Sequence, residues 1–179
     1  MTLREVWNSM LALVGVGSEP FKPTLINGVP NLTAVAPRLW RMGQPESPAA
    51  WAFLVRVLGD NVTVVKLNED GEGLDTPLGG WTLIRASIPP YDDRPWTVVE
   101  RPDPAKVRAI VNTIVEAHRA GKTIVWHCTA GRDRTGLVSA LVQMRLFDLS
   151  KSDAWADMLA HGFRWELLDL DVYWTLDGP

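Results

Sequence analysis

The sequence predicts a single-domain α/β fold in which helices flank a mostly parallel central sheet. Short β-branched runs of strand length alternate along the chain with longer segments whose apolar residues recur at helical spacing, which is typical of βαβ units. The chain has 179 residues, of which 46% are hydrophobic and 22% are charged, so it suits one domain with an ordinary core. We expect residues 1–23 to form an N-terminal helix and a connection, and residues 24–179 to form the main domain.

The elements of the N-terminal half are predicted from caps and turn residues. Residues 31–45 indicate two short strands or a hairpin. Ser47 suits an N-cap, Pro48 suits the first position of a helix, and Gly59 is suited to end that helix. The buried face of this helix is predicted from the spacing of Trp51, Leu54, Val55 and Leu58.

The rest of the chain continues the alternation of strands and helices. We expect strands over Val62–Leu67, Trp81–Ile88 and Lys122–His127. Loops at 68–80 and 89–102 are rich in glycine, proline and acidic residues. We expect helices from Asp103-Pro104 onward, over Thr135–Phe147, from a Ser152 cap to Leu159, and in a last segment with Trp165, Leu168 and Tyr173. In the helix after Asp103, helical spacing predicts one buried face, made of Val107, Ile110, Val111, Ile114 and Val115.

Composition and charge argue against several classes of protein. A net charge of −3 argues against a general nucleic-acid binder. The single cysteine excludes an internal disulfide and fits a reducing, cytoplasmic location. The apolar run Met10–Val16 is shorter than the roughly 20 residues that cross a bilayer, so no membrane span is expected. Three histidines, His118, His127 and His161, show no metal-ligand spacing, so we expect no metal or other cofactor; the oligomeric state stays unknown.

The segment Ile124–Gly136 is the most informative in the chain. A buried strand is predicted to end at His127, a loop of seven residues runs from Cys128 to Arg134, and a helix starts near Thr135. The backbone N–H groups of such a loop can surround a tetrahedral anion, and the helix adds the positive end of its dipole. The same field favours the thiolate form of the cysteine, which beside a bound phosphate is a nucleophile aimed at phosphorus.

One arginine and two glycines complete this loop. Arg134 can fold back over the loop and donate two hydrogen bonds to phosphoryl oxygens from its planar guanidinium group. Gly131 and Gly136 allow a tight turn and a close approach of the backbone to the anion. A small buried hydrophobe is the usual alternative for a lone cysteine, but the joint spacing of these residues argues against chance. The residues themselves therefore predict covalent phosphoryl transfer.

The motif HCxxGxDRTG, from His127 to Gly136, resembles the phosphate-binding loop of the protein tyrosine phosphatase superfamily. Within that superfamily, the chain is most similar to the small dual-specificity phosphatases and their bacterial relatives. Arg38–Pro45 resembles an early strand of that group, and Ala154–Phe163 resembles the helix after the loop. The likeness extends over Asn31–Phe163 and implies a cysteine-phosphatase fold.

The resemblance implies a role for each position of the loop. Cys128 would form a phosphocysteine intermediate, and Arg134 would bind the substrate and the transition state. The hydroxyl of Thr135 would stabilise the leaving thiolate, and His127 would orient the loop. The other phosphate-binding positions are Thr129, Ala130, Gly131, Arg132 and Asp133. The implied partner is a phosphorylated protein or a small phosphorylated substrate.

The family mechanism also needs a carboxylic acid that protonates the leaving oxygen. In the family this acid comes from a loop that precedes the cysteine, and here that loop carries Asp92 and Asp93, which the sequence does not separate. Asp133 is the rival. It is either the acid or a structural residue that holds Arg132 or Arg134.

Other interpretations stay open beside the leading one. Arg132 puts a second cation at the rim of the loop, where related lipid and inositol phosphatases read further phosphates, so a phosphoinositide or inositol-phosphate phosphatase is the second interpretation. A catalytically inactive phosphate-binding module is the third, and a rhodanese-type sulfurtransferase, whose loop lacks the Arg-Thr-Gly exit, is the fourth.

The sequence also departs from the family pattern at one position. Where many relatives carry an arginine after the strand Val62–Leu67, this chain has Asn68. The charged residues near this strand and elsewhere are expected to form either a charge network beneath the site or a solvated loop. They are Arg41, Glu69, Glu72, Asp75 and Arg85.

Overall fold

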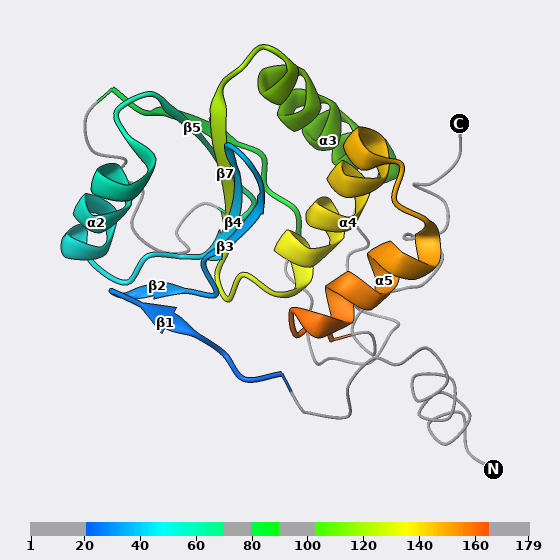
Figure 1. Cartoon of the computed structure of the whole chain (residues 1–179), viewed down its shortest axis with the longest axis horizontal. Coiled ribbons are helices and arrows are strands. Elements are labelled where there is room, and N and C mark those ends of the chain that lie inside the picture. The colour runs from blue at the N-terminus through cyan, green and yellow to red at the C-terminus, as the bar shows by residue number, and fades with distance from the viewer. Residues whose placement is uncertain (1–20, 70–79, 90–102, 165–179) are drawn as a thin grey trace.

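The fold is given by a computed structural model, which describes residues 21–69, 80–89 and 103–164. These residues build a five-stranded sheet with the strand order β3-β4-β7-β5-β6 (Figure 1). The strands are β3 (Thr33–Ala36), β4 (Leu39–Gly43), β5 (Val62–Lys66), β6 (Thr82–Arg85) and β7 (Thr123–Cys128). β3 pairs antiparallel with β4, whereas the other three pairings are parallel. The prediction of an α/β fold with a mostly parallel central sheet is confirmed.

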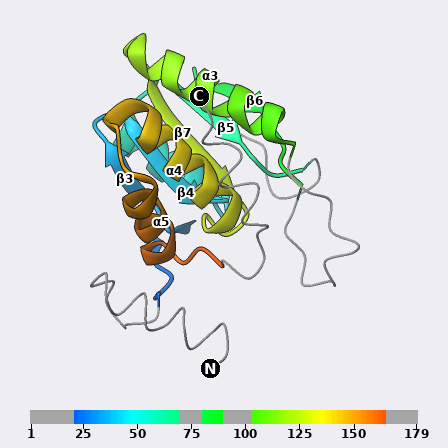
Figure 2. The same cartoon turned by 90° about the vertical axis from the view of Figure 1, so that its right-hand side faces the viewer.

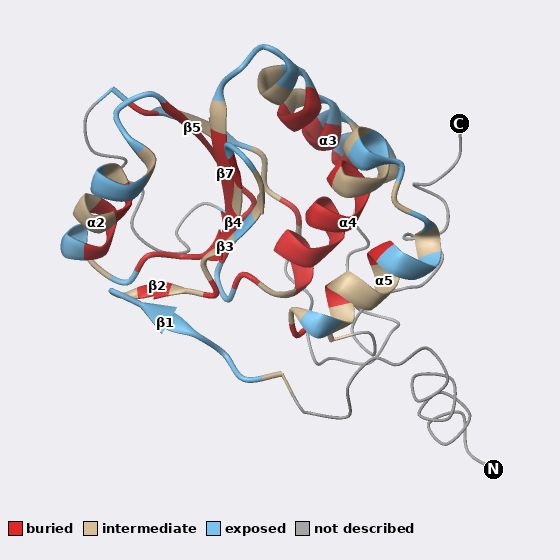
Figure 3. Cartoon of the chain, in the orientation of Figure 1, coloured by how far each residue is buried: buried red, intermediate tan, exposed pale blue. Residues whose placement is uncertain are grey.

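Helices cover both faces of the sheet. α2 (Pro48–Leu58) lies against one face, while α3 (Pro104–Arg119) and α4 (Asp133–Phe147) lie against the other, and α5 (Lys151–Ala160) packs on α4 (Figures 1 and 2). Each face has its own apolar core. On the α2 side this core includes Met42, Trp51 and Val125, and on the α4 side it includes Trp126 and Leu137. Figure 3 shows the buried residues concentrated on the central strands and on α4.

The predicted caps and buried faces explain where the helices begin and how they pack. The Oγ atom of Ser47 accepts a hydrogen bond from the backbone N–H of Ala50 at 3.2 Å, and Pro48 follows as the first helical residue. The carboxylate of Asp103 caps α3 in the same way, through Ala105 at 2.9 Å. The five buried apolar residues of α3 are those that the helical spacing predicts.

Two predicted boundaries are wrong by two residues. α4 begins at Asp133 rather than near Thr135, so the end of the predicted loop forms the first turn of the helix. α5 is capped by Ser150, whose Oγ atom accepts from the N–H of Asp153 at 3.1 Å, and the predicted cap Ser152 lies inside the helix. Sequence spacing did not separate two serines that are both suited to cap a helix.

A short antiparallel hairpin of β1 (Leu25–Ile26) and β2 (Val29–Pro30) precedes the sheet and is absent from the predicted elements. The predicted N-terminal helix and the last helical segment lie outside the described residues, and the division of the chain at residue 23 stays a prediction. Among the described helices, none is long and apolar enough to cross a membrane.

Candidate active site

The loop that follows β7 lies at the carboxyl end of the central strand. β7 runs between β4 and β5, both parallel to it, and Gly43 at the end of β4 is in register with Cys128. In open α/β sheets, ligands bind where parallel strands end. The thiol of Cys128 is therefore placed at the usual binding edge, in a residue that is 3% exposed.

Three successive carbonyl groups of the loop are turned outward and hydrogen-bonded. The carbonyl of Thr129 accepts from the N–H of Gln44 at 2.9 Å. The carbonyl of Ala130 accepts from the Nδ2 of Asn31 at 2.8 Å. The carbonyl of Gly131 accepts from the guanidinium of Arg41 at 3.1 Å. The partners all come from residues 31–44, so this N-terminal segment determines which way the peptide planes of the loop face.

The outward carbonyls turn the next N–H groups of the loop inward. In a trans peptide the C=O and N–H bonds point in opposite directions, and the described backbone contains no cis peptide. The N–H groups of Ala130, Gly131 and Arg132 therefore face the inside of the loop. Within the described residues, none of these three N–H groups donates to a protein acceptor. The first turn of α4 adds its own N–H groups at the same place.

Glycine is required at the centre of this loop. Gly131 has a φ of 69°, in the left-handed region that favours glycine. A Cβ atom at this position would lie 2.5 Å from the carbonyl carbon of Met42 and 2.7 Å from its oxygen. The loop thus packs directly on the backbone of β4, which leaves no room for a side chain.

The side chain of Arg134 folds back over the loop, as the sequence predicts. Its Nη2 atom donates to the Oγ1 of Thr129 at 3.2 Å, and its Nη1 donates to the carbonyl of Ile88 at 3.3 Å. The residue is 6% exposed. The guanidinium group is therefore held in place by the loop on one side and by the segment after β6 on the other.

Two further predicted residues flank the loop and are buried. The hydroxyl of Thr135 donates to the carbonyl of Met42 at 3.5 Å, and the residue is fully buried. His127 is 1% exposed, and its ring packs edge-on against Trp51 with centroids 6.0 Å apart. The contact of Thr135 thus joins the start of α4 to β4, and the contact of His127 joins the end of β7 to α2.

Arg132 and Asp133 bind the segment that follows α5. The Nε of Arg132 donates to the carbonyl of Gly162 at 2.7 Å, and its guanidinium lies over the ring of Phe21 at 5.2 Å. The carboxylate of Asp133 pairs with the guanidinium of Arg164 at 2.6 Å. The expectation that Asp133 holds Arg132 or Arg134 is therefore wrong, because its partner comes from 31 residues further along the chain.

Asp92 and Asp93 lie outside the described residues. They follow Ile88, whose carbonyl accepts the hydrogen bond from Arg134, by four and five residues along the chain. Each residue of an extended chain spans at most about 3.3–3.6 Å, so four or five residues separate these aspartates from a point already in contact with the site. Both therefore stay candidates for the general acid.

The sequence named Arg41 only as one member of a possible charge network beneath the site, and it did not predict a contact between Arg41 and the loop. Arg41 is 1% exposed, and among the described residues its charged partner is Asp157 of α5, with Nη1 and Oδ2 at 4.0 Å. Glu72 and Asp75 lie outside the described residues. Burial lowers the pKa of Arg41 to about 10, while the charges of Asp157 and Cys128 oppose this shift. The sequence did hold a signal that Arg41 is buried. Arg41 lies two residues after Leu39 in the same strand, so both side chains point to the same face of the sheet, toward the core.

One cavity among the described residues lies away from this site. A cavity of about 330 Å³ is lined by Thr63, Thr82 and Lys122 among others, at the amino ends of the parallel strands and so at the opposite edge of the sheet from Cys128. In the part of the chain that the structure describes, no cluster of three or more His, Cys, Asp or Glu residues is arranged to hold a metal ion.

Comparison with known proteins agrees with this geometry. Residues 95–162, which include the loop, match the model of the tyrosine phosphatase family. The resemblance to the protein tyrosine phosphatase superfamily is confirmed. A protein of Cupriavidus necator that is provisionally named a tyrosine-protein phosphatase is 33% identical over 76 residues, which make up 42% of this chain and 28% of that protein. The chain thus matches less than a third of the length of that relative.

Solved phosphatase structures share the fold of the chain. The active form of Tk-PTP superposes with a TM-score of 0.62 at 22% identity, over 82% of this chain and 92% of that one. TpbA of P. aeruginosa superposes with a TM-score of 0.54 at 21% identity, over 90% of this chain and 99% of that one. The single-domain fold of tyrosine and dual-specificity phosphatases that the sequence predicts is therefore present.

Proposed function

We propose that the chain is a cysteine-dependent phosphatase of the tyrosine or dual-specificity type, which hydrolyses phosphomonoesters through a phosphocysteine intermediate. One observation carries the proposal. The inward N–H groups of Ala130, Gly131 and Arg132 belong to the loop that begins at Cys128 and over which the guanidinium of Arg134 folds back. This arrangement offers donors for the oxygens of a phosphoryl group and a nucleophile for its phosphorus.

The reaction takes place in two displacements at phosphorus. The thiolate of Cys128 attacks the phosphorus atom, an S–P bond forms, and the P–O bond to the leaving group breaks. The leaving oxygen takes a proton from a carboxylic acid. A water molecule then attacks the phosphocysteine and gives its proton to the same carboxylate, which releases inorganic phosphate and regenerates the thiolate.

Other residues of the loop have supporting roles in this proposal. The guanidinium of Arg134 binds two phosphoryl oxygens and follows them through the transition state. The Thr135 hydroxyl stabilises the thiolate as it leaves the phosphorus, and His127 orients the loop from beneath. A nucleophilic thiolate must stay reduced, so we also propose a reducing, cytoplasmic location.

We propose that the general acid is Asp92 or Asp93, both of which belong to the loop that begins beside Arg134. The contact between Arg134 and Ile88 supports this assignment, because it brings the start of that loop to the site. Asp92→Asn and Asp93→Asn should be compared on phenyl phosphate, whose leaving group is poor. The assignment fails if both variants keep full turnover of this substrate.

The first experiment is hydrolysis of para-nitrophenyl phosphate without added metal, by the wild type and by Cys128→Ser. We expect turnover that disappears in the variant, because serine does not form a comparable nucleophile at neutral pH. Equal turnover by both proteins would show that Cys128 is not the nucleophile. If both are inert but bind inorganic phosphate, the chain is a phosphate-binding module instead.

The second candidate substrate class is an inositol phosphate or phosphoinositide. The observation that favours it is Arg132, which uses its Nε atom to bind Gly162 and so holds a cation at the rim of the loop. A panel of soluble inositol phosphates and phosphotyrosine peptides separates the two classes. The Arg132→Met variant should lose activity selectively on inositol phosphates if this second class is correct.

A further inference from the structure

Arg41 and Cys128 lie on the same face of the sheet, two register positions apart. Leu39, Arg41 and Gly43 alternate along β4 onto the face that α4 and α5 cover. Arg41 is in register with Trp126, and Gly43 is in register with Cys128. Because Gly43 has no side chain, nothing from β4 separates the guanidinium of Arg41 from the floor of the loop.

The surroundings of Arg41 compensate its charge only in part. The single hydrogen bond that its guanidinium makes is donated by Nη2 to the carbonyl of Gly131, while its Nε and Nη1 atoms are buried without a hydrogen-bond partner. Removing a cation from water costs several kcal/mol unless charges and hydrogen bonds replace the solvent. A buried group with unmatched donors calls for a physical explanation, which is often a functional one.

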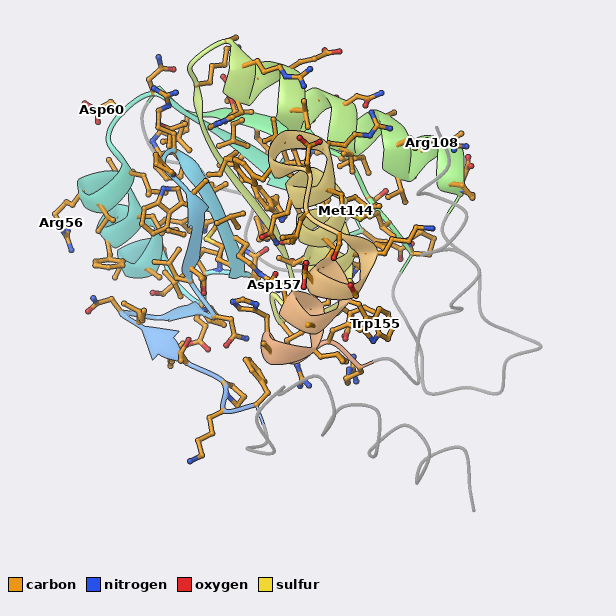
Figure 4. All side chains as sticks on the ribbon, turned by 45° about the vertical axis from the view of Figure 1, so that its right-hand side comes forward. Arg56, Asp60, Arg108, Met144, Trp155 and Asp157 are labelled. Atoms are coloured by element: carbon orange, nitrogen blue, oxygen red, sulfur yellow. The ribbon has the colours of Figure 1, made fainter. Side chains whose placement is uncertain are left out.

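Two groups that can carry a negative charge lie near this cation on different elements. Asp157 approaches it from α5 at 4.0 Å, and Cys128 lies at the end of β7, two register positions along the same face of the sheet. The carboxylate of Asp157 is shared with other partners, since Gln143 donates to it at 2.9 Å and the Nδ1 of His161 lies 3.2 Å from it. Figure 4 shows Asp157 between α5 and the sheet. Because this carboxylate is shared and lies 4.0 Å away, it neutralises Arg41 only in part.

We propose that Arg41 is a positioning residue beneath the loop, which stabilises the thiolate of Cys128 and holds the loop through Gly131, while Asp157 weakens this effect. This inference rests on the proposed function, in which the thiolate of Cys128 is the nucleophile. Its physical content is independent of turnover, because it concerns the charge state of one sulfur atom.

The proposal makes two predictions of opposite sign. Loss of the positive charge at residue 41 removes an attraction for the thiolate, so the thiolate should form at a higher pH. Loss of the negative charge at residue 157 removes a repulsion, so the thiolate should form at a lower pH. A structural role alone would not move the two variants in opposite directions.

The chain contains a single cysteine, so the rate of alkylation by iodoacetamide and the thiolate absorbance near 240 nm report on Cys128 alone. Both are measured against pH in the full chain for the wild type, Arg41→Met, Arg41→Lys and Asp157→Asn. Arg56→Met is the matched control, because Arg56 extends from α2 away from the site (Figure 4) and is exposed. Circular dichroism confirms that each variant is folded.

At a pH below the midpoint of the wild-type thiol titration, we expect the fraction of Cys128 present as thiolate to be about tenfold lower in Arg41→Met. This corresponds to a shift of about one pH unit in the titration curve. Arg41→Lys keeps the charge and should restore most of the fraction. Asp157→Asn should raise it about threefold, and Arg56→Met should leave it unchanged. If Arg41→Met does not fold, Asp157→Asn decides the question, because its carboxylate is partly exposed and its amide keeps the same shape.

The proposal is overturned if the profile of a folded Arg41→Met or that of Asp157→Asn matches the wild type, or if both move in the same direction. These outcomes are distinct from a failure of the proposed function. A chain that hydrolyses no phosphomonoester but shows the opposite shifts would keep the inference and lose the phosphatase. A chain whose turnover depends on Cys128 but whose thiolate ignores both charges would do the reverse.

Discussion

The carboxylate of Asp133 accepts hydrogen bonds from both the backbone and the side chain of Arg164. The N–H of Arg164 donates to Oδ1 at 3.0 Å, and its Nε and Nη2 donate to Oδ2 at 3.0 and 2.6 Å. Asp133 is the first residue of α4, next to Arg134. The pair thus ties the end of the loop that begins at Cys128 to the segment that follows α5.

Asp133→Asn should slow turnover by less than about tenfold, and equally for para-nitrophenyl phosphate and phenyl phosphate. The asparagine oxygen still accepts the N–H of Arg164, so only the contacts to the guanidinium are weakened. If Asp133 were the general acid, the loss on the poorer leaving group would be selective and on the order of 10²-fold or more. The ratio of the two kcat values therefore distinguishes an anchor from an acid.

A double-mutant cycle with Arg164→Gln measures the strength of this anchor. Because the side chain of Arg164 is 38% exposed, solvent screens the pair, and we expect a coupling free energy of about 1 kcal/mol from urea unfolding. A coupling of zero would mean that the pair does not stabilise the fold.

The parts of the molecule that the sequence predicted correctly are those that local spacing determines. The buried face of α3 follows from helical periodicity, and the cap of α2 follows from Ser47 and Pro48. The loop motif identified Cys128 and Arg134 for the same reason, because all of its residues lie within one short segment.

The parts that the sequence did not predict depend on contacts between distant residues. Asn31 binds the carbonyl of Ala130 from 99 residues away, and Arg41 binds that of Gly131 from 90 residues away. The alternation along β4 indicates that Arg41 points inward, but no local pattern in the sequence names the carbonyl groups that Asn31 and Arg41 bind. Only the folded sheet brings β4 beside β7 and shows that both side chains hold the loop.

Gly131→Ala should abolish activity and lower the free energy of unfolding by more than about 2 kcal/mol. The substitution places a Cβ atom 2.5 Å from the backbone of Met42 and in the left-handed region, which already costs about 1–2 kcal/mol. Backbone atoms of a central strand do not yield, so the loop must move away from β4 and lose its shape.

The matched control for this substitution is Gly121→Ala. Gly121 also has a positive φ, 81°, but a Cβ atom there would meet nothing within 4 Å. Urea unfolding should show that Gly121→Ala lowers the free energy of unfolding by about 1 kcal/mol. Turnover of para-nitrophenyl phosphate should stay at the wild-type level. Equal effects of the two substitutions on activity would refute the argument from close packing on β4.

The acid limb of the stability curve should depend on Asp157. Burial acts to raise the pKa of Asp157, but hydrogen bonds from His161 and Gln143 and the charges of His161 and Arg41 lower it below its ordinary value of 3.8. A carboxylate with a lowered pKa stabilises the fold at every pH above its unfolded pKa. This contribution is lost as the pH falls through the lower, folded value.

Asp157→Asn should therefore destabilise the protein by about 1–2 kcal/mol near neutral pH, and the difference from the wild type should shrink below about pH 4. Urea unfolding at about pH 7 and at about pH 2.5 measures both limits, and Asp60→Asn at an exposed carboxylate (Figure 4) controls for a general effect of charge. At low pH the wild-type carboxylate is protonated and no longer attracts Arg41, so the two proteins become alike. A difference that is the same at both pH values would mean that Asp157 contributes through packing and not through its charge.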